Sequence, residues 1–468
     1  MSEQDDRAPR DVAVIDVGSN SVRLVVYRLE GRAIWTVYNE KVLAGLGSEL
    51  AQSGRLSPRG VQDALSALRR FSAVLDAAPP ARLLVAGTAA VRDAKDGAEF
   101  VARISAETGL AVRVLTGEDE ARYAALGVLA GTPAASGLAA DLGGASLELT
   151  RVHRGKVGAG VSLPLGPFNL RGPDGFDAGR VRSRSSKVLG EVAANFSAQT
   201  LYAVGGGWRN LALLQMYIAS YPLRIVHQYE MSAVDALDAA RFIARQSKTS
   251  LERIEGLSKR RLETLPYAAV VLETLIERLG LKRIVLSAYG LREGLLLETM
   301  PEHLRAQDPL VAGCEALGLR QGVSEDVGAA LADWIWPLFS RLPPLFGERD
   351  RTLLSAACRL ADVGARLHPD HRAHLVFEQV LRAPLAGLDH PERAFLAMAL
   401  FTRHTTSGQP PEADILARLL TSERTARAKA LGAAMRLGCD LSGRSADLLR
   451  RSRLNLEGEV ITLAAEAR

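Results

Sequence analysis

Short apolar runs separated by turn residues fill the first part of the chain, with longer segments of helical periodicity between them. The runs predict strands at 12–17, 22–29, 33–38, 82–86 and 111–115. Apolar residues at three- and four-residue steps predict helices at 57–78 and near 90–107. Strands mixed with crossover helices are typical of an α/β sheet, so we expect an α/β domain over residues 1–125.

The same order then starts again. Strands are predicted at 137–142, 146–152, 156–163, 200–204 and 282–287, and helices near 178–196, 207–217 and 265–279. The first turns of the two halves also align without a gap at a 125-residue offset: Asp16-Val17-Gly18-Ser19-Asn20-Ser21-Val22 matches Asp141-Leu142-Gly143-Gly144-Ala145-Ser146-Leu147. We therefore expect a second α/β domain over residues 126–305 that repeats the first.

Beyond residue 305 the pattern changes to helices alone. Amphipathic spacing or helix-forming composition predicts them at 309–317, 325–341, 349–366, 371–382, 391–403, 411–421 and 422–437. We expect an all-α domain over residues 306–468, which gives this 468-residue chain three domains.

Positive charge gathers near the end of the chain, although the whole protein has a net charge of only +5. Residues 418–453 contain three acids and nine basic residues: Arg418, Arg424, Arg427, Lys429, Arg436, Arg444, Arg450, Arg451 and Arg453. A polyanionic partner would explain this run, and so would a basic helical face in contact with water.

The cysteines and the apolar runs bear on the compartment. Cys314, Cys358 and Cys439 form no CxxC pair, which argues against a zinc site or a disulfide framework and favours a reducing compartment. The segment MSEQDDRAPR lacks the apolar stretch of a secretory signal, and no run of about 18 apolar residues occurs. We expect a cytoplasmic protein that has neither a membrane nor nucleic acid as a partner.

The two aligned turns have a composition that suits phosphate. Gly18, Gly143 and Gly144 let the backbone come close to a ligand, and N–H groups of successive small residues form an anion-binding hollow. Two such turns across a cleft would hold a phosphate from both sides, with Asp16 and Asp141 beside it to hold Mg²⁺ or its waters. Each turn alone is equally well explained as an ordinary β-turn, so the aligned pair is the stronger signal.

Two further junctions are candidates for anion binding. Gly205-Gly206-Gly207 ends a predicted strand and begins a helix, where N–H groups and the helix dipole attract anions. Close strand–helix packing explains these glycines equally well. Arg92 follows another strand–helix junction and could pair with phosphate oxygens or form an ordinary salt bridge.

Carboxylates near the turns are candidates for catalysis. The acids of Thr116-Gly117-Glu118-Asp119-Glu120-Ala121-Arg122 also suit the start of a helix, where they would only cap it. Glu148, seven residues after Asp141, alternates onto the same face as Ser146. A carboxylate beside bound phosphate could orient and deprotonate a water for in-line attack.

Eight segments, in order, resemble the exopolyphosphatase and guanosine pentaphosphate phosphatase (Ppx/GppA) family of the actin-like ATPase superfamily. They cover most of residues 11–300: AVIDVGSNSVRLVV, AGTAAVRDAKDG, LTGEDEARYAALGV, AADLGGASLEL, LPLGPFNL, YAVGGGWRNLA, LSKRRLETLPYAAVVLE and VLSAYGLREGLLLE. The resemblance implies an α/β fold with two ribonuclease-H-like (actin-like ATPase) domains flanking a cleft. In that cleft a terminal phosphoryl group would be hydrolysed with Mg²⁺ or Mn²⁺.

The resemblance also implies residue roles. It selects Glu120 over Glu118 as the catalytic glutamate, because Glu120 directly precedes an Ala-Arg pair. Glu148 is then a second catalytic acid, and with Asp16 and Asp141 it would hold the metal. The expected phosphate-binding residues are Gly18, Ser19, Asn20, Ser21, Arg92, Gly143, Gly144, Ala145, Ser146, Gly206 and Gly207.

The chain departs from the family pattern in three places. Where the family often reads Asp-Ile-Gly-Gly-Gly-Ser-Thr-Glu, this chain has Ala145, which we expect to be tolerated, and Leu147. We expect Leu147 to remove a hydroxyl that would help hold metal, water or phosphate. The last domain resembles the family's HD-like domain, but its metal-binding His-Asp pair reads Ala361-Asp362. We expect that domain to be non-catalytic, to extend a polyanion groove and to support a homodimer.

Four functions follow from this reading. The first is an exopolyphosphatase that removes the terminal phosphate of inorganic polyphosphate, using Mg²⁺ and a water activated by Glu120. The second is hydrolysis of the 5′-phosphate of guanosine pentaphosphate by the same machinery, alone or together with the first. A non-catalytic binder of guanosine tetraphosphate and a kinase-like ATPase are the remaining two, and no motif for a kinase acceptor site is found.

Overall fold

The computed structural model describes residues 8–254, 257 and 262–466. The chain forms two compact units, Met1–Arg305 and Ala306–Arg468, which are described in turn. Of the segment LSKRRLETLPYAAVVLE, residues 258–261 lie outside the described residues.

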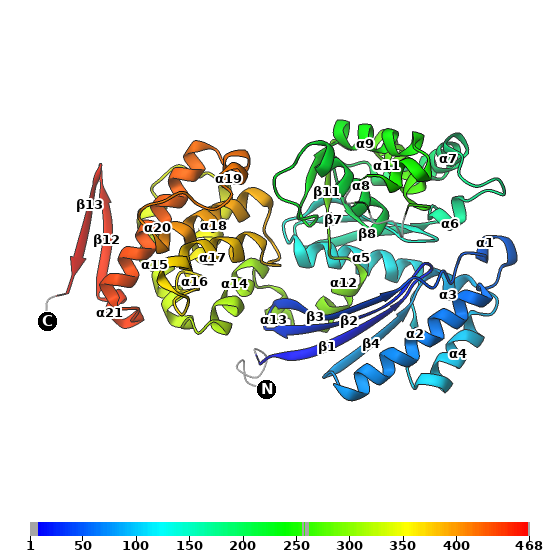
Figure 1. The fold of residues 1–468 in the computed structure, drawn as a ribbon, viewed down its shortest axis with the longest axis horizontal. Helices are drawn as coiled ribbons and strands as arrows, with labels where there is room; N and C mark the ends of the chain where they lie inside the picture. Colours follow the sequence, from blue (N-terminus) through cyan, green and yellow to red (C-terminus); the bar gives the residue numbers. More distant parts are fainter. Residues whose placement is uncertain (1–7, 255–256, 258–261, 467–468) are drawn as a thin grey trace. The chain divides into compact units, whose positions relative to one another are not determined.

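The first unit begins with a five-stranded sheet in the order β3-β2-β1-β4-β5 (Figure 1). Its strands are β1 (Arg10–Val17), β2 (Val22–Glu30), β3 (Ala33–Val42), β4 (Arg82–Gly87) and β5 (Arg113–Val114). Successive residues of β1 point to opposite faces of the sheet. Ile15 belongs to the core that Phe71 of α2 (Pro58–Ala77) completes, and Val14 to the core that Leu296 of α12 (Leu291–Thr299) completes. Helices therefore cover both faces.

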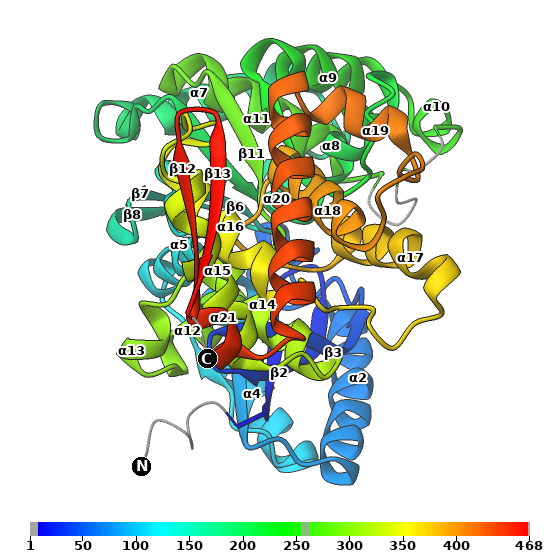
Figure 2. The ribbon, with the colours of Figure 1, turned by 90° about the vertical axis from the view of Figure 1, so that its left-hand side faces the viewer.

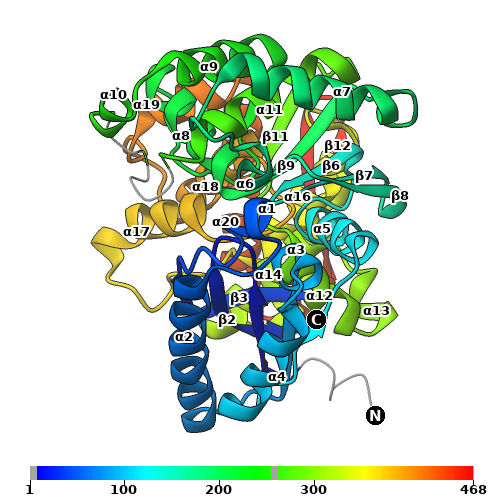
Figure 3. The same cartoon turned by 90° about the vertical axis from the view of Figure 1, so that its right-hand side faces the viewer.

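The helices on the first of these faces follow one another closely in sequence. They are α1 (Leu50–Ser53), α2, α3 (Ala89–Asp93) and α4 (Gly97–Thr108), and Figure 3 shows α2 and α4 side by side. The helix predicted near 90–107 is thus two helices. Ala94 between them has extended backbone (φ −77°, ψ 139°), which ends α3 before α4 begins.

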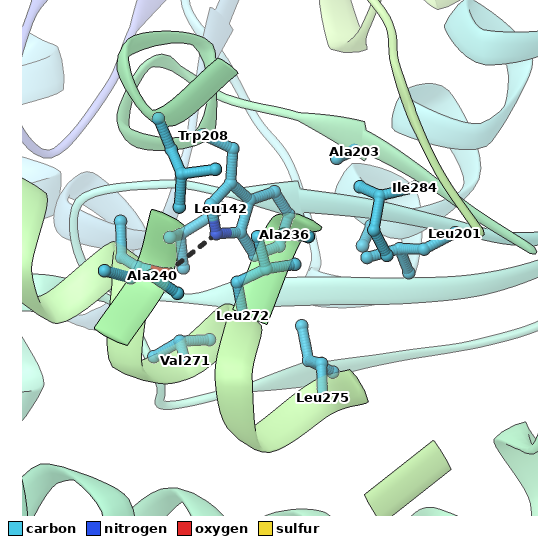
Figure 4. Close-up of a cluster of buried hydrophobic side chains, with 14 of the residues drawn as sticks. Leu142, Leu201, Ala203, Trp208, Ala236, Ala240, Val271, Leu272, Leu275 and Ile284 are labelled. Atoms are coloured by element: carbon cyan, nitrogen blue, oxygen red, sulfur yellow. Dashed lines mark hydrogen bonds between the residues drawn. The ribbon is translucent and has the colours of Figure 1, made fainter. Parts of the chain in front are cut away.

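A second sheet follows, with six strands in the order β10-β11-β9-β6-β7-β8. The strands are β6 (Ser136–Leu142), β7 (Leu147–His153), β8 (Lys156–Leu163), β9 (Thr200–Val204), β10 (Glu230–Ser232) and β11 (Arg283–Leu286). The core on one face is completed by α7 (Ala178–Phe196), α8 (Gly206–Ile218), α9 (Ala233–Arg245) and α11 (Leu265–Leu279). Trp208 lies among Leu142 and Leu272 in this core, and its indole N–H donates to the Ala268 carbonyl at 2.9 Å (Figure 4).

Helix α5 (Gly117–Gly131) is shared by the two sheets. Tyr123 belongs to the core of the first sheet, whereas Ala125 and Val128 belong to a core of the second. A Cβ added to Gly127 would lie 1.9 Å from the Gly290 carbonyl oxygen, so α5 approaches the start of α12 at a distance that only glycine allows. This close approach fixes the start of α12 against α5, the helix that the two sheets share.

Apart from β10, the two sheets have the same strand order. β1 and β6 are each antiparallel to the next strand and parallel to β4 and β9, respectively. The predicted α/β architecture with a repeated sheet is confirmed. The division at residue 125 stays a prediction, and that residue lies within α5.

The sequence pattern missed several elements of the first unit. These are α1, α6 (Pro167–Leu170), β10, α9, α10 (Lys248–Glu252), α12 and α13 (Glu302–Arg305). Of these, α12 matters most for function, because it begins at the cavity described below.

The second unit is helical, as predicted. Its helices are α14 (Pro309–Arg320), α15 (Glu325–Phe339), the short 3₁₀ helix Gly347–Arg349, α16 (Asp350–Arg359), α17 (Pro369–Arg382), α18 (His390–His404), α19 (Ala413–Leu419), α20 (Ser422–Ser442) and α21 (Ala446–Arg450). The helix predicted at 349–366 ends earlier, at Arg359, and the chain then turns through Gly364, whose φ is +84°. The unit closes on a hairpin that the sequence pattern did not predict, β12 (Ser452–Glu457) and β13 (Val460–Ala465).

Membrane-spanning character is a property of helix length and apolarity. Among the helices of the described part of the chain, none combines enough length with enough apolar character for a span.

Candidate functional site

Two turns of the same geometry lie at the ends of the central strands. Residues 16–22 lead from β1 into β2, and residues 141–147 lead from β6 into β7. In each turn a glycine N–H donates to the carbonyl of the serine three residues later, from Gly18 to Ser21 and from Gly143 to Ser146, both at 3.0 Å. The repeat seen in the sequence is therefore one turn used twice.

The two turns touch each other. A Cβ added to Gly144 would lie 3.2 Å from the Ser19 Cβ and 3.3 Å from the Asn20 Cβ. The second turn is held from behind, because the carbonyl of Gly144 accepts from the Phe168 N–H at 2.9 Å. A side chain at position 144 would crowd both neighbours, so glycine sets the separation of the turns.

A cavity of about 250 Å³ opens beside the turns. Its charged lining residues are four acids and four bases: Asp16, Glu120, Asp141, Glu148, Arg23, Lys41, Arg209 and Arg292. When all eight are ionised their formal charges cancel. A polyanion entering alone would thus meet no net attraction from these groups, and a divalent cation would supply it.

The acidic residues at the start of α5 have different roles, and only some of them are explained by helix capping. Asp119 is occupied as a cap: its N–H donates to the Thr116 hydroxyl at 3.0 Å, and its carboxylate accepts from the Thr116 N–H at 3.3 Å. Glu118 is exposed to solvent, whereas Glu120 is buried and lines the cavity. The simple capping explanation therefore holds for Asp119 and fails for Glu120.

The environment of Glu120 changes its acidity. Burial raises the pKa of Glu120 to about 7, against the Arg92 guanidinium, which lowers it, and with Asp16 and Asp141, which raise it further. Arg92 donates to the Glu120 carboxylate and, at 3.1 Å, to the Leu115 carbonyl. Glu120 is thus a buried carboxyl group that titrates near neutral pH.

The second turn carries two more carboxyl groups of raised pKa. Asp141 and Glu148 are register partners on β6 and β7. Burial raises the pKa of Asp141 to about 7, and Glu148 and Asp16 add to the effect. Burial and Glu120 raise the pKa of Glu148 to about 7, whereas hydrogen bonds from Ser146 and Ser162 lower it. The Ser162 hydroxyl donates to Glu148 Oε1 at 2.9 Å.

These carboxyl groups suit a hard divalent cation. Neighbouring carboxyl groups raise one another's pKa values by charge repulsion. A bound cation opposes this effect and favours the ionised form of each group. Within the described residues, no group of three or more His, Cys, Asp or Glu side chains is arranged to hold a metal by itself. Mg²⁺ commonly binds through one or two carboxylates, several waters and substrate phosphate, so Asp141 and Glu148 fit such a site.

The first turn is different, because its carboxylate faces arginine. Arg292 Nη1 donates to Asp16 Oδ2 at 3.0 Å. Burial lowers the pKa of Arg292, but Glu293, Tyr27 and Asp16 raise it above its usual range on balance. Glu293 accepts from the Tyr27 hydroxyl at 2.5 Å and from the Gly290 N–H at 2.8 Å, which holds the start of α12 in place.

Arg23 and Arg292 line the cavity but were not predicted. Arg23 lies 125 residues before Glu148 and is the register partner of Asp16. The alternation that places Glu148 on the cavity face would have found it. Arg292 gives a weaker signal: it lies two residues after Gly290, which follows the strand predicted at 282–287.

Most of the predicted site residues line the cavity: Asp16, Gly18, Ser19, Asn20, Ser21, Glu120, Asp141, Gly143, Gly144, Ser146, Glu148, Gly206 and Gly207. Arg92 and Ala145 are not among the lining residues, so their phosphate-binding roles stay predictions. The carbonyl of Ala145 accepts from the Gly166 N–H at 3.0 Å, and Arg92 contacts Glu120 instead.

Two sequence expectations take a more definite form. Leu147 is fully buried in the core under the second sheet, so its side chain lies on the face opposite Glu148. The expectation that a missing hydroxyl there would affect metal, water or phosphate is therefore wrong. In the glycine cluster, Gly205 has a φ of +118°, and a Cβ on Gly207 would lie 2.5 Å from the Ala268 Cβ, so packing alone already requires glycine at both positions.

Several charged side chains of the second unit interact with other groups of the same unit. The Asp362 carboxylate, which an HD-like site would offer to a metal, accepts from Arg444 Nε at 2.7 Å and lies 3.7 Å from Arg403. Arg424 lies 4.1 Å from the Phe346 ring centre, and Arg427 donates to the Pro343 carbonyl at 3.1 Å. The remaining basic residues that face solvent include Lys429, Arg451 and Arg453.

Comparisons with known proteins agree with this geometry. The sequence profile of the Ppx/GppA phosphatase family matches residues 25–303, and that of the C-terminal part of exopolyphosphatases matches residues 310–465. Exopolyphosphatase 1 of Mycobacterium tuberculosis is 27% identical over 304 residues, which cover 62% of this chain and 88% of that protein. Retrograde regulation protein 2 of Saccharomyces cerevisiae is 25% identical over 453 residues, which cover 86% of this chain and 73% of that protein.

Solved structures give the same picture. The crystal structure of the Aquifex aeolicus member of the Ppx/GppA family is 26% identical, with a TM-score of 0.54, and the match covers 62% of this chain and 96% of that one. An exopolyphosphatase from Cytophaga hutchinsonii has the same fold, with a TM-score of 0.57 at 22% identity over 62% of this chain and 98% of that one.

Proposed function

This chain belongs to the Ppx/GppA phosphatase family, and from that membership we propose that it is an exopolyphosphatase. It would hydrolyse the terminal phosphate of inorganic polyphosphate with Mg²⁺ or Mn²⁺ and a water activated by Glu120. The observation that carries this proposal is the buried Glu120 carboxyl in the cavity where the two glycine turns touch. The curated relative named exopolyphosphatase supports the choice of substrate.

The turns would bind the terminal phosphate through their backbone. The N–H groups of Gly18 and Gly143 close the turns themselves. We therefore assign phosphate contact to the N–H groups that follow, at residues 19–21 and 144–146, with the hydroxyls of Ser19, Ser21 and Ser146. Such N–H groups are fixed donors that need no reorganisation as charge moves onto the phosphate oxygens.

Asp141 and Glu148 would hold the cation, which when bound neutralises phosphate charge and helps orient the phosphate. Ser162 fixes one oxygen of Glu148 by its hydrogen bond. Arg23, Lys41 and Arg209 line the cavity and would balance the charge of the next phosphates of the chain. The turns would thus bind the terminal phosphate through backbone N–H groups, and the basic side chains would bind the next phosphates of the chain through their charge.

Glu120 would take the proton of the attacking water. A general base works best when its pKa lies near the working pH, and burial raises the pKa of Glu120 to about 7. Arg92 contacts the same carboxylate, so it would orient Glu120 and keep a share of it ionised. In-line attack at phosphorus is mainly a matter of positioning, which a buried, ion-paired carboxylate provides.

Guanosine pentaphosphate is the alternative substrate, since its terminal phosphate would fit the same turns. A regulatory role without turnover is a second candidate. It is favoured by the relative named retrograde regulation protein, whose match covers 86% of this chain. A kinase-like ATPase has no such support.

Phosphate release from long-chain polyphosphate and from guanosine pentaphosphate, assayed side by side with Mg²⁺, tests the proposal. We expect Glu120→Gln to reduce release from the preferred substrate by about 10²–10⁴-fold, the range that a general base contributes. The matched control is Glu118→Gln, two residues away and exposed, which should keep wild-type release. Wild-type turnover in Glu120→Gln would rule out the proposed base, and no release from either substrate by the wild type would favour the regulatory role.

A further inference from the structure

Two loops hold the glycine turns in place, one in each half of the first unit. β3 lies beside β2 at the edge of the first sheet, and β8 lies beside β7 at the edge of the second (Figure 2). The third residue after each edge strand is a glycine, Gly45 after β3 and Gly166 after β8. We call residues 43–48 and 164–169 the backing loops. The first leads into α1 and the second contains the start of α6, and these two short helices lie beside each other (Figure 3).

The first backing loop binds two carbonyl groups of the first turn. The Gly45 N–H donates to the Asn20 carbonyl at 3.1 Å, and the Gly47 N–H donates to the Ser19 carbonyl at 2.8 Å. A Cβ added to Gly47 would lie 3.1 Å from the Ser19 Cβ, so the loop packs tightly against the turn. Both carbonyl groups therefore point towards the loop.

The second backing loop repeats these bonds. The Gly166 N–H donates to the Ala145 carbonyl at 3.0 Å, and the Phe168 N–H donates to the Gly144 carbonyl at 2.9 Å. The two accepting residues lie 125 positions after those of the first turn, and the two donors are again two residues apart. The repeat thus extends from the turns to the loops that hold them.

A carbonyl held in this way also fixes the N–H group of the next residue. The peptide unit is planar and trans, so its C=O and N–H groups point in opposite directions. The bond to the Ala145 carbonyl therefore turns the Ser146 N–H away from the backing loop. The bond to the Asn20 carbonyl does the same for the Ser21 N–H. Both serines line the cavity, and within the described residues their N–H groups donate to no other group of the protein, so they are left to bind a ligand.

One side chain adds to this arrangement in the second half. Asn169 Nδ2 donates to the Ala145 carbonyl at 2.7 Å, so this carbonyl accepts two hydrogen bonds. The backbone of Asn169 is itself held, because its N–H donates to the Gly166 carbonyl at 3.0 Å and its carbonyl accepts from Arg184 Nη1 at 2.5 Å. A carbonyl oxygen has two lone pairs, and with both engaged the peptide unit between Ala145 and Ser146 has little freedom to rotate.

We infer that Asn169 is a positioning residue of this site, which aims the Ser146 N–H at the bound phosphate by holding the Ala145 carbonyl. The inference rests on the proposed function, because it assigns substrate phosphate to these N–H groups. Donors that are fixed before the substrate binds need no reorganisation when charge develops on the phosphate oxygens. If Asn169 only stabilised the loop, its loss would lower the melting temperature and leave the phosphate affinity of the folded molecule unchanged.

Calorimetric titration with inorganic phosphate in the presence of Mg²⁺ tests this role without hydrolysis. We expect Asn169→Leu, which keeps the size of the side chain and removes the donor, to weaken phosphate binding by about three- to tenfold, the range of one ordinary hydrogen bond. Asn169→Gln retains an amide donor and should recover part of the affinity. Asn195→Leu, the same change at an exposed position of α7, is the matched control and should bind phosphate as the wild type does.

Affinity is compared per folded molecule, with circular dichroism as the check. Asn169→Ser, whose side chain is too short to reach the carbonyl, decides in the same way if Asn169→Leu does not fold. Wild-type phosphate affinity in the folded variant would overturn the inference, and so would a wild type that binds no phosphate. Weakened binding in the variant of a protein that hydrolyses neither polyphosphate nor guanosine pentaphosphate would refute the proposed function and support the positioning role.

Discussion

The two glycine turns share a frame and differ in charge. Both close with the same N–H to carbonyl bond at 3.0 Å, and both lead from the central strand of a sheet to its antiparallel neighbour. Across the strands, however, Asp16 faces Arg23 in the first half, whereas Asp141 faces Glu148 in the second. Asp16 also accepts from Arg292 at 3.0 Å.

The difference indicates a division of work between the halves. A carboxylate paired with arginine already has its countercharge, so the first half gains less from a cation. In the second half, burial raises the pKa of both Asp141 and Glu148 to about 7, with Glu148 raising that of Asp141 further and Glu120 raising that of Glu148. A bound cation would reverse these shifts. We therefore assign cation binding to the second half, and neutralisation of the substrate's negative charge to the first half.

Substitution of the matched pair Arg23 and Glu148 should separate these roles most strongly. We expect Glu148→Gln to lower kcat by at least about 10²-fold, because the group that holds cation and water is lost. Arg23→Gln should mainly raise KM, by about tenfold, as expected for one charge-assisted contact to substrate. Steady-state phosphate release measures both, and equal effects on kcat would remove the distinction between the halves.

The pH dependence of phosphate release should reflect the ionisation of Glu120 and of the two carboxyl groups in the second half, Asp141 and Glu148. Glu120 must be ionised to accept a proton, and its pKa is about 7, as are those of the two carboxyl groups that would hold the cation, so kcat/KM should fall by at least about tenfold per pH unit below 7. Saturating Mg²⁺ should move this limb to lower pH, since a cation favours ionised carboxylates. A profile that stays flat from pH 5 to pH 8 would be inconsistent with a buried glutamate as base.

Leu147 and Val22 occupy the same place in the two halves, and both are fully buried. We expect Leu147→Thr and Val22→Thr each to lower the free energy of unfolding by about 1–3 kcal/mol, the usual cost of a buried hydroxyl without a partner. Phosphate release per folded molecule should be unchanged. Urea unfolding measures the first effect. A gain of activity in Leu147→Thr would show that this side chain reaches the site after all.

Local pattern predicted much of this fold. Helices α7 and α11 and strand β9 begin and end at the predicted residues, because apolar periodicity continues up to clear polar or glycine boundaries. The short β10 and the α12 helix were missed, because three residues give no period and α12 is apolar on several sides, between α5 and β1. The closing hairpin was missed because helical composition runs up to it.

The site was predictable where it is repeated in the sequence. The two turns, and Glu148 behind the second, follow from alignment of the halves and from strand alternation. The contact between Arg292 and Asp16 joins residues 276 positions apart, which no local window contains. That Glu120 is buried while Glu118 is exposed depends on how α5 packs between the sheets, which is a property of the folded chain.

Mg²⁺-dependent thermal stability of Asp16→Asn and Asp141→Asn, measured with inorganic phosphate present, tests the division of work most directly. We expect Mg²⁺ to raise the melting temperature of the wild type and of Asp16→Asn by about 2–4 °C, the shift that roughly 1 kcal/mol produces in a domain of this size. Asp141→Asn should lose this shift. Loss of the shift in Asp16→Asn and its retention in Asp141→Asn would contradict the assignment of the cation to the second half.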